Sequence, residues 1–298
     1  MAEDIIRISS GNATAAVKTF GAQLTSLCVN GAEYLWQGDD RWWGGQAPVL
    51  FPIVGCVRDG HATSGAGPCT MRRHGVARDY QHEVVETTAD HVTLRLDAND
   101  ETLAAYPYPF RLEMTYALDG ATLTQSFAVT NTGTAPIPFC VGGHPAFFVP
   151  LPGTDGERWE DYELAFEEPW SYDTPVMAPG ELWDWNTRVS LIDDTDVLPL
   201  TRELFAHDTV VLEGVPQSRV TLRSRKSGAG IRVDFAGMDY LGIWSAGGAK
   251  GDAPFLAIEP WTGTATRTDE DDALEHKQGV IIAKPGERVV RSFSITVL

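Results

Sequence analysis

The stretch that decides the fold class of this chain is FRLEMTYALDGATLTQSFAVTN, residues 110–131. Apolar and polar residues alternate in residues 110–118 and again in residues 121–131, as they do in strands that bury one face. Asp119-Gly120 stands between the two runs, and Asp-Gly is a strong hairpin signal because its residues must tolerate positive φ. The stretch therefore predicts an antiparallel β-hairpin.

Similar runs recur along the chain, and Asn30-Gly31 marks a second tight turn after residues 22–29. Further strand-like runs are residues 91–96, 209–212, 219–223, 231–235, 279–283 and 288–297. Helical signal is scarce: residues 268–277 favour one short helix, and residues 201–207 favour a turn or two. Because strands and helices do not alternate, the pattern predicts an all-β sandwich or barrel.

Residues 150–187 differ from the rest, because proline, glycine, acidic residues and four tryptophans crowd together there. Flexible linkers lack aromatic residues at this density. We therefore expect an irregular but well-packed excursion of one domain that covers residues 1–298.

Charge and cysteine content narrow the function. The chain has 23 basic and 41 acidic residues and a net charge of −18, which would repel phosphate backbones and anionic lipid. We expect no nucleic-acid or membrane partner. The N-terminus lacks the pattern of a signal peptide, and no run approaches the ~20 apolar residues of a membrane span. The four cysteines have no metal-like spacing, which favours a reducing, cytoplasmic location.

The stretch FLAIEPWTG, residues 255–263, combines a strand-like run with a carboxylate, Glu259. Proline cannot donate to a β-ladder, so we expect the strand to end at Pro260 and Glu259 to stand at its mouth. Loss of solvent beside Pro260 and Trp261 would raise the proton affinity of the carboxyl, which suits a general base. Alternatively, this glutamate closes a strand and pairs with a nearby arginine.

Two histidines stand beside glycines: His74 in RHGVARD, residues 73–79, and His144 in VGGHPAFF, residues 141–148. A lone histidine is usually a structural residue. Glycine, however, lets a ligand approach the backbone, and sites gather on loops at strand ends.

Two imidazoles and a carboxylate allow three kinds of site. They can bind zinc or iron, although no helical His-x-x-x-His is present. A nucleophilic triad is the weakest alternative, because no Ser or Cys stands on a recognisable elbow. In acid–base chemistry, the glutamate accepts a proton and a histidine donates one.

Five motifs, in order, resemble those of the aldose 1-epimerase (mutarotase) family. They are residues 47–60, 74–79, 143–147, 204–208 and 258–263. EYLWQG, residues 33–38, fits the same family and is nearest to its LacX-like branch. The resemblance extends from about residue 30 to the C-terminus.

The resemblance implies a galactose-mutarotase-like fold, an antiparallel β-supersandwich with few short helices. It also implies cofactor-independent interconversion of the α and β anomers of free aldoses, with no metal. By position, Glu259 matches the general base, His144 the general acid and His74 a second active-site histidine.

Four residues are expected to bind the sugar. Arg58, Arg78 and Asp208 match positions that contact its hydroxyls or their substituents, and Trp261 or Phe51 is placed to cover an apolar face. Cys56 departs from the family, which often has a polar or basic residue there, and this leaves Arg58 as the guanidinium of the first motif.

Three alternatives remain open. A hexose-6-phosphate mutarotase would need basic groups near the mouth, for which the candidates are Arg72, Arg73, Arg78 and Lys250, although Arg72 and Arg73 would point to opposite faces of a strand. A sugar-binding protein without turnover and a metal hydrolase or isomerase are the others. We expect a small-molecule sugar as partner and a monomer or weak homodimer.

Overall fold

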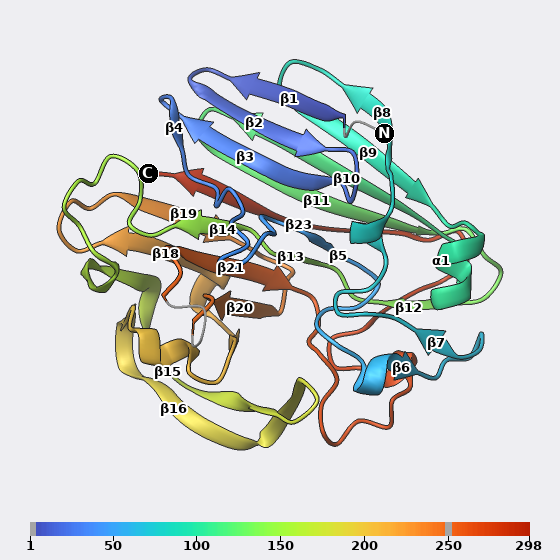
Figure 1. The fold of residues 1–298 in the computed structure, drawn as a ribbon. Helices are drawn as coiled ribbons and strands as arrows, with labels where there is room; N and C mark the ends of the chain where they lie inside the picture. The colour runs from blue at the N-terminus through green and yellow to red at the C-terminus, as the bar shows by residue number, and fades with distance from the viewer. Residues whose placement is uncertain (1–3, 248–251) are drawn as a thin grey trace.

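The computed structural model describes residues 4–247 and 252–298, and residues 110–131 lie in its largest antiparallel sheet (Figure 1). Asp119 pairs with Thr122, so the loop of the predicted hairpin is Gly120-Ala121, one residue later than expected. Gly120 has a φ of +54°, as a tight turn of this kind requires. The prediction of a hairpin is confirmed, and the turn is shifted because Asp119 still belongs to the ladder.

Within the described residues, this sheet has nine strands. In spatial order they are β16 (Leu182–Pro199), β15 (Tyr162–Ala178), β18 (Arg219–Ser224), β19 (Gly230–Asp234), β23 (Arg288–Val297), β11 (Thr122–Asn131), β10 (Phe110–Asp119), β9 (His91–Asp97) and β8 (Glu83–Thr87).

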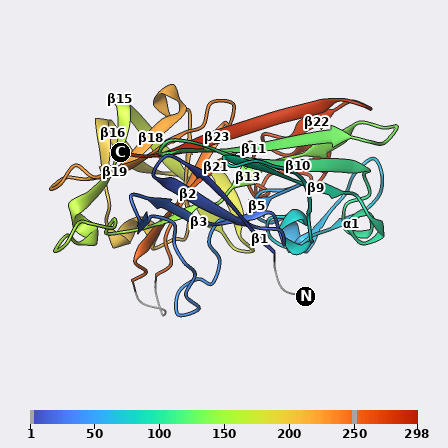
Figure 2. The same cartoon turned by 90° about the horizontal axis from the view of Figure 1, so that it is seen from above.

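A smaller sheet from the N-terminus covers part of the large one (Figures 1 and 2). Its strands are β1 (Ile5–Ser10), β2 (Ala13–Lys18), β3 (Gln23–Val29) and β4 (Ala32–Glu33). Tyr116, fully buried on β10, donates its hydroxyl hydrogen to the carbonyl of Ala22 at 2.6 Å and so joins the two sheets. Asn30-Gly31 forms the predicted turn between β3 and β4, with φ of +54° and +79°.

The third sheet carries the candidate site. Its strands are β17 (Val210–Glu213), β20 (Tyr240–Trp244), β21 (Phe255–Trp261), β13 (Gly142–Gly143), β5 (Val49–Leu50) and β14 (Ala146–Phe148), which also pairs with β21. It lies very close to the large sheet at Gly143, where an added Cβ would come within 2.4 Å of the Phe293 ring on β23. Only glycine permits this approach, so the two sheets share one core.

Two short pairs of strands complete the sheets in the described part of the chain. They are β12 (Ile137–Phe139) with β22 (Ile281–Ala283), and β6 (His61–Ala62) with β7 (Cys69–Thr70). The antiparallel sheets and the shared core confirm the predicted all-β fold class.

The prediction that β21 ends at Pro260 is wrong, because the strand continues to Trp261. Its amides at Ile258 and Thr262 donate to the carbonyls of Pro145 and Val141. Pro260 lies between them, where the neighbouring chain breaks between β13 and β14. A missing N–H costs no ladder bond at such an irregularity, so proline is tolerated inside a buried strand.

The helix predicted in residues 268–277 is also wrong. There the structure has only a short 3₁₀ turn, η7 (Leu274–His276). The Arg58 guanidinium binds the carbonyls of Arg267, Thr268 and Glu270, which an α-helix would have needed for its own hydrogen bonds.

The α-helix that the structure describes, α1 (Asp100–Ala105), was not predicted. Its start is capped by Asn99, whose side chain accepts hydrogen bonds from the amides of Glu101 and Thr102. The other 3₁₀ turns described are η1 (Arg58–Gly60), η2 (Ala77–Asp79), η3 (Trp159–Asp161), η4 (Arg202–Phe205) and η5 (Pro216–Ser218).

Strands β15 and β16 form a long hairpin, hereafter the arm, where an irregular excursion was expected. The ladder shifts register between Ala165 and Trp170 and between Pro175 and Val176, that is, beside Pro169 and Pro175. Such bulges accommodate proline and conceal the strand pattern in the sequence. In Figure 1 the arm curves away from the end of the large sheet and passes below the third sheet.

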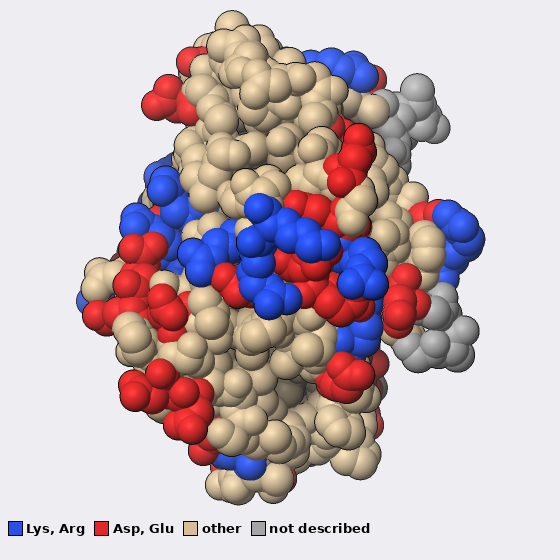
Figure 3. All heavy atoms as spheres, turned by 90° about the vertical axis from the view of Figure 1, so that its left-hand side faces the viewer, with Lys and Arg blue, Asp and Glu red and all other residues tan. Residues whose placement is uncertain are grey.

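Charged side chains of both signs are interleaved on the side of the molecule seen in Figure 3. On β18 and β19, for example, Arg219 and Arg232 both contact Asp234, and Arg223 contacts Glu163. Among residues 4–247 and 252–298, no helix is long and apolar enough to cross a membrane.

Candidate active site

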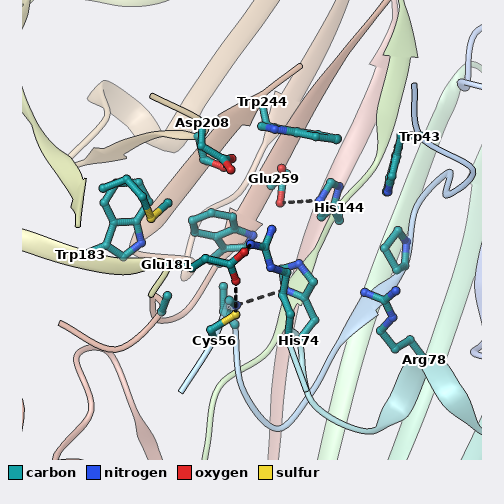
Figure 4. Close-up of a pocket in the computed structure, with 18 residues that line it drawn as sticks. Trp43, Cys56, His74, Arg78, His144, Glu181, Trp183, Asp208, Trp244 and Glu259 are labelled. Carbon is teal, nitrogen blue, oxygen red and sulfur yellow. Dashed lines mark hydrogen bonds and ion pairs between the residues drawn. The ribbon is translucent and has the colours of Figure 1, made fainter. Parts of the chain in front are cut away.

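A cavity of about 240 Å³ opens over the third sheet, and the three predicted catalytic residues line it together (Figure 4). The lining residues are Trp43, Pro48, Val54, Gly55, Cys56, Arg73, His74, Arg78, His144, Met177, Glu181, Trp183, Asp208, Thr209, Trp244, Glu259, Trp261 and Ala265. This volume suits a small polar molecule rather than a drug-sized ligand, whose sites span roughly 300–1,000 Å³. We call Glu259, His144 and His74 the cavity floor.

Glu259 and His144 form a buried pair. Glu259 stands on β21, and His144 lies at the break between β13 and β14, so the same irregularity that tolerates Pro260 brings the histidine beside the glutamate. His144 Nε2 is 3.3 Å from Glu259 Oε2, and the two residues are 8% and 2% exposed. A carboxyl and an imidazole this close can pass a proton between them.

Burial shifts the pKa values of both residues of this pair so that their neutral forms are favoured. Loss of solvent, with a smaller contribution from the negative charge of Asp208, raises the pKa of Glu259 well above its usual range. Loss of solvent also lowers the pKa of His144 to about 3. With one proton on the pair, burial therefore favours a protonated Glu259 beside a neutral His144, and not the carboxylate and imidazolium with which the expected base and acid would begin.

His74 is held by two reciprocal backbone contacts. Its amide donates to the carbonyl of Gly55 at 2.8 Å, and the Gly55 amide donates to His74 Nδ1 at 3.1 Å. Burial, followed by the charges of His144 and nearby arginines, keeps the pKa of His74 well below its usual range. Because Nδ1 accepts a hydrogen bond, the neutral ring carries its hydrogen on Nε2 and is a hydrogen-bond donor there.

A strained turn sets the position of His74. Its φ is +71°, and the next residue, Gly75, has a φ of +75°. A Cβ on Gly75 would lie 2.4 Å from the carbonyl oxygen of Phe51. A positive φ raises the conformational free energy of a residue with a side chain, and such residues often mark functional sites. The turn at His74 is therefore strained.

Aromatic rings border the cavity floor. Trp43 stacks on His144 with ring centroids 4.8 Å apart, and Trp244 meets the same imidazole edge-on at 5.8 Å. Trp261 lines the cavity as predicted, whereas Phe51 is fully buried in the core against Phe110 and does not line it. The alternative of Phe51 as a sugar cover is therefore wrong, and the sequence reasoning missed the rings of Trp43 and Trp244.

Besides Trp261, two of the predicted sugar-binding residues reach the cavity, Arg78 and Asp208. Arg78 is half-buried, and no hydrogen bond or ion pair joins its guanidinium to any described residue. Desolvation, and then the charges of Arg72 and Arg73, lower the pKa of Arg78 from its usual value. Asp208, held at a φ of +80°, points into the cavity opposite (Figure 4). A cation and an anion are thus available to sugar hydroxyls.

Arg58 lies outside this cavity. Its guanidinium binds the carboxylate of Asp272 at 3.0 Å and three carbonyls of the loop that follows β21. The prediction that Arg58 contacts the sugar has no support in this geometry, because its donors already have partners. Arg58 was chosen as a sugar-binding residue because Cys56 stands where the family often has a polar or basic residue, and Arg58 is the arginine of the same motif.

Two of the arginines considered as phosphate ligands form ion pairs with different carboxylates. Arg72 pairs with Asp79, and Arg73 pairs with Glu181 at the tip of the arm. Both arginines lie in a turn and not in a strand, so alternation of strand faces was the wrong reason for separating them. Arg73 lines the cavity, where it was considered only as a partner for a phosphate, and Glu181, which also lines it, was missed. Lys250 lies outside the described residues.

No group of three or more His, Cys, Asp or Glu side chains suitable for a metal ion is found among the residues that the structure describes. Cys28, Cys56, Cys69 and Cys140 are all free thiols. Burial and a hydrogen bond to Glu181 raise the pKa of Cys56 to about 11.

Comparison with known proteins identifies the family of this chain. The model of the aldose 1-epimerase family matches residues 4–293, and the chain belongs to this family.

Its relatives include LacX proteins of Lactococcus lactis. The chromosomal form is 38% identical over 98% of this chain and 99% of its own length. Among solved structures, a galactose mutarotase related enzyme from Lactobacillus acidophilus superposes with a TM-score of 0.92, at 31% identity, over 99% of this chain and 97% of that one. A galactose mutarotase-like protein from Lactobacillus casei gives a TM-score of 0.89 at 30% identity, over 99% and 100% of the two chains. These relatives confirm the predicted family and its galactose-mutarotase-like fold.

Proposed function

We propose that this protein is an aldose 1-epimerase that interconverts the α and β anomers of free aldohexoses. The observation that carries the proposal is the buried pair of Glu259 and His144, 3.3 Å apart, with His74 beside it in one cavity. The anomeric hydroxyl and the ring oxygen of a sugar are bonded to the same carbon. An acid and a base that serve both must therefore lie close together, as these two residues do.

In the proposed ring opening, Glu259 takes the proton of the anomeric hydroxyl and His144 gives a proton to the ring oxygen. The bond from C1 to the ring oxygen breaks and the C1 carbonyl forms, so protons and electrons balance. The open chain rotates about its C1–C2 bond and recloses with the two roles reversed. Such positioned groups each contribute typically 10²–10⁴-fold to a rate.

The pKa directions favour one of the two protonation states in this cycle. After ring opening, Glu259 holds the proton and His144 is neutral, which is the state that burial favours. Before it, the pair must be ionised, and one proton shift from Glu259 Oε2 to His144 Nε2 produces that form. The low-dielectric cavity thus stabilises the neutral pair that accompanies the open-chain sugar, relative to the ionised pair that precedes ring opening.

The remaining residues have positioning roles in this proposal. His74 would donate its Nε2 hydrogen to the ring oxygen or a neighbouring hydroxyl. Arg78 and Asp208 would hold hydroxyl groups, and Trp43, Trp244 and Trp261 would enclose the apolar parts of the ring.

An NMR exchange survey tests the proposal. Several aldoses and their 6-phosphates would be equilibrated with the protein, and transfer of magnetisation between the α and β signals would be measured. We expect exchange of at least one free aldohexose to rise well above the spontaneous rate. Binding without faster exchange would instead identify a sugar-binding protein, and faster exchange of phosphates alone would identify a sugar-phosphate mutarotase.

A further inference from the structure

Glu181 reaches the cavity from the tip of the arm, in the turn between β15 and β16. It has a φ of +61°, which is costly for a residue with a side chain. Both carboxylate oxygens are engaged: Oε1 pairs with the Arg73 guanidinium, and Oε2 accepts a hydrogen bond from Cys56 Sγ at 2.9 Å. A strained turn therefore holds the Glu181 carboxylate against the Arg73 guanidinium in the cavity wall. Backbone strain of this kind often accompanies a functional role.

Arg73 is the group that this carboxylate neutralises. Its positive charge is felt at all three residues of the cavity floor, where it lowers the pKa values of His74, His144 and Glu259. Without Glu181, Arg73 and the unpaired Arg78 would be two free guanidinium groups on the wall of a small cavity. Two such groups are a strong attraction for a phosphate or a carboxylate.

We propose that Glu181 is a specificity-determining residue: by pairing with Arg73 it makes the cavity reject sugars with an anionic substituent, so that the substrates are uncharged aldoses. This inference rests on the proposed aldose 1-epimerase function. An anionic group that approaches Arg73 meets guanidinium donors already paired with a carboxylate. Displacing that carboxylate would leave two negative charges a few ångström apart in a partly desolvated site.

The opposite possibility is that Arg73 and Arg78 clamp a phosphate and Glu181 yields to it. The two possibilities differ in what happens when the charge of Glu181 is removed with its shape kept. If Glu181 excludes anions, E181Q gains activity toward them. If a phosphate displaces Glu181 in normal turnover, the wild-type protein already prefers the phosphate.

The experiment compares kcat/KM for glucose and for glucose 6-phosphate by NMR exchange at low ionic strength. We expect the wild type to favour glucose, and E181Q to reduce the ratio of glucose to glucose 6-phosphate by about 10-fold or more, since a like charge near the substituent is removed. The double variant R73Q/E181Q should restore the ratio, because the cation that attracts the phosphate is gone.

E113Q is the matched control. Glu113 also pairs with an arginine, Arg288 at 3.2 Å, but it lies on the large sheet and does not line the cavity. E113Q removes the same charge and should leave the ratio unchanged. Inhibition by inorganic phosphate gives a second measurement, in which the inhibition constant for E181Q should be about 10-fold lower than for the wild type.

A ratio in E181Q equal to that in E113Q, with an unchanged inhibition constant, would overturn the inference while leaving the proposed function intact. A wild type that prefers glucose 6-phosphate would overturn it as well. If the wild type accelerates exchange of neither free nor phosphorylated aldoses, the proposed function itself fails, so the two failures are distinguishable.

Discussion

The cavity floor and the tip of the arm reach the same cavity from contrasting surroundings. Glu259, His144 and His74 are each less than 9% exposed; Glu259 and His144 lie on or beside strands with neighbours on both sides, and His74 lies in a buried turn. Glu181 belongs to the turn of a hairpin at the edge of the large sheet, and its side chain is 54% exposed. The floor is enclosed on all sides, whereas the tip of the arm is open to solvent even though Trp183 and Trp185, farther along the arm, are buried against the third sheet.

The attachment of the arm combines apolar packing of its buried tryptophans with backbone hydrogen bonds. Its contacts to the loop after β21 include a hydrogen bond from the Trp183 amide to the Thr266 carbonyl and another from the Thr268 amide to the Trp183 carbonyl. Changes in the floor should therefore alter the chemical step or the fold, and changes at the tip should alter which ligand is held. Edge hairpins can vary at a lower cost in stability than a shared core, because they bury less apolar surface.

The largest effect is expected from E259Q, which keeps the shape of the floor and removes the proposed base. The rate of anomer exchange, followed by polarimetry, should fall by about 10²–10⁴-fold. The same substitution in the control E113Q should leave the rate unchanged. A near-wild-type rate in E259Q would show that Glu259 is not the base and that the floor does not carry the chemistry.

Gly75→Ala tests how tightly the floor is packed. A side chain at this φ, against the carbonyl oxygen of Phe51, should lower the free energy of unfolding by about 2–4 kcal/mol. Gly120→Ala is the control, since Gly120 also has positive φ but has no atom within 4 Å of an added Cβ. It should lose only about 1–2 kcal/mol. Equal losses in urea unfolding would mean that the turn that contains His74 and Gly75 is no more constrained than an open hairpin.

Acid should weaken the interior around the floor, where buried histidines lie, and not the arm, which has no histidine. His82 follows the turn that carries Arg78, and burial lowers its pKa to about 4. The unfolded chain, with a pKa near 6.5, therefore binds the proton more tightly, and stability is lost as the pH falls from about 6.5 to about 4.

His82→Leu should remove this loss. At pH 5, relative to pH 7.5, the wild type should lose about 2 kcal/mol more unfolding free energy than the variant. Urea unfolding at the two pH values measures the difference. If both proteins lose the same amount, His82 is not buried in its neutral form.

The smallest effect is expected from Met177→Ala on the arm. Met177 lines the cavity and is half-buried, so the variant loses an apolar contact of about 1 kcal/mol. The KM for the sugar should rise about 5-fold with little change in kcat. A fall in kcat of comparable size would contradict the separation between the arm and the floor.

Sequence reasoning predicted some elements well because their signals are local. Alternation of polar and apolar residues and the turn glycines indicated the strands of the large sheet, including residues 288–297, which form β23. The arm and the course of β21 through Pro260 were missed. Proline is excluded from strands as a rule, and only a break in the neighbouring strand, which no local pattern records, permits the exception.

What the sequence by itself determined is the fold class and the family, and it named three side chains as candidates for acid–base chemistry, since these depend on residue types and on the order of motifs. Only the tertiary structure decided that Glu259, His144 and His74 share one cavity, that Arg58 is bound by the loop of Asp272, and that Arg73 is paired with Glu181. Residues 73 and 181 are far apart in the chain and meet because the arm folds back to the third sheet. The partner of a charged side chain is fixed by that long-range packing, and no local pattern of residues specifies it.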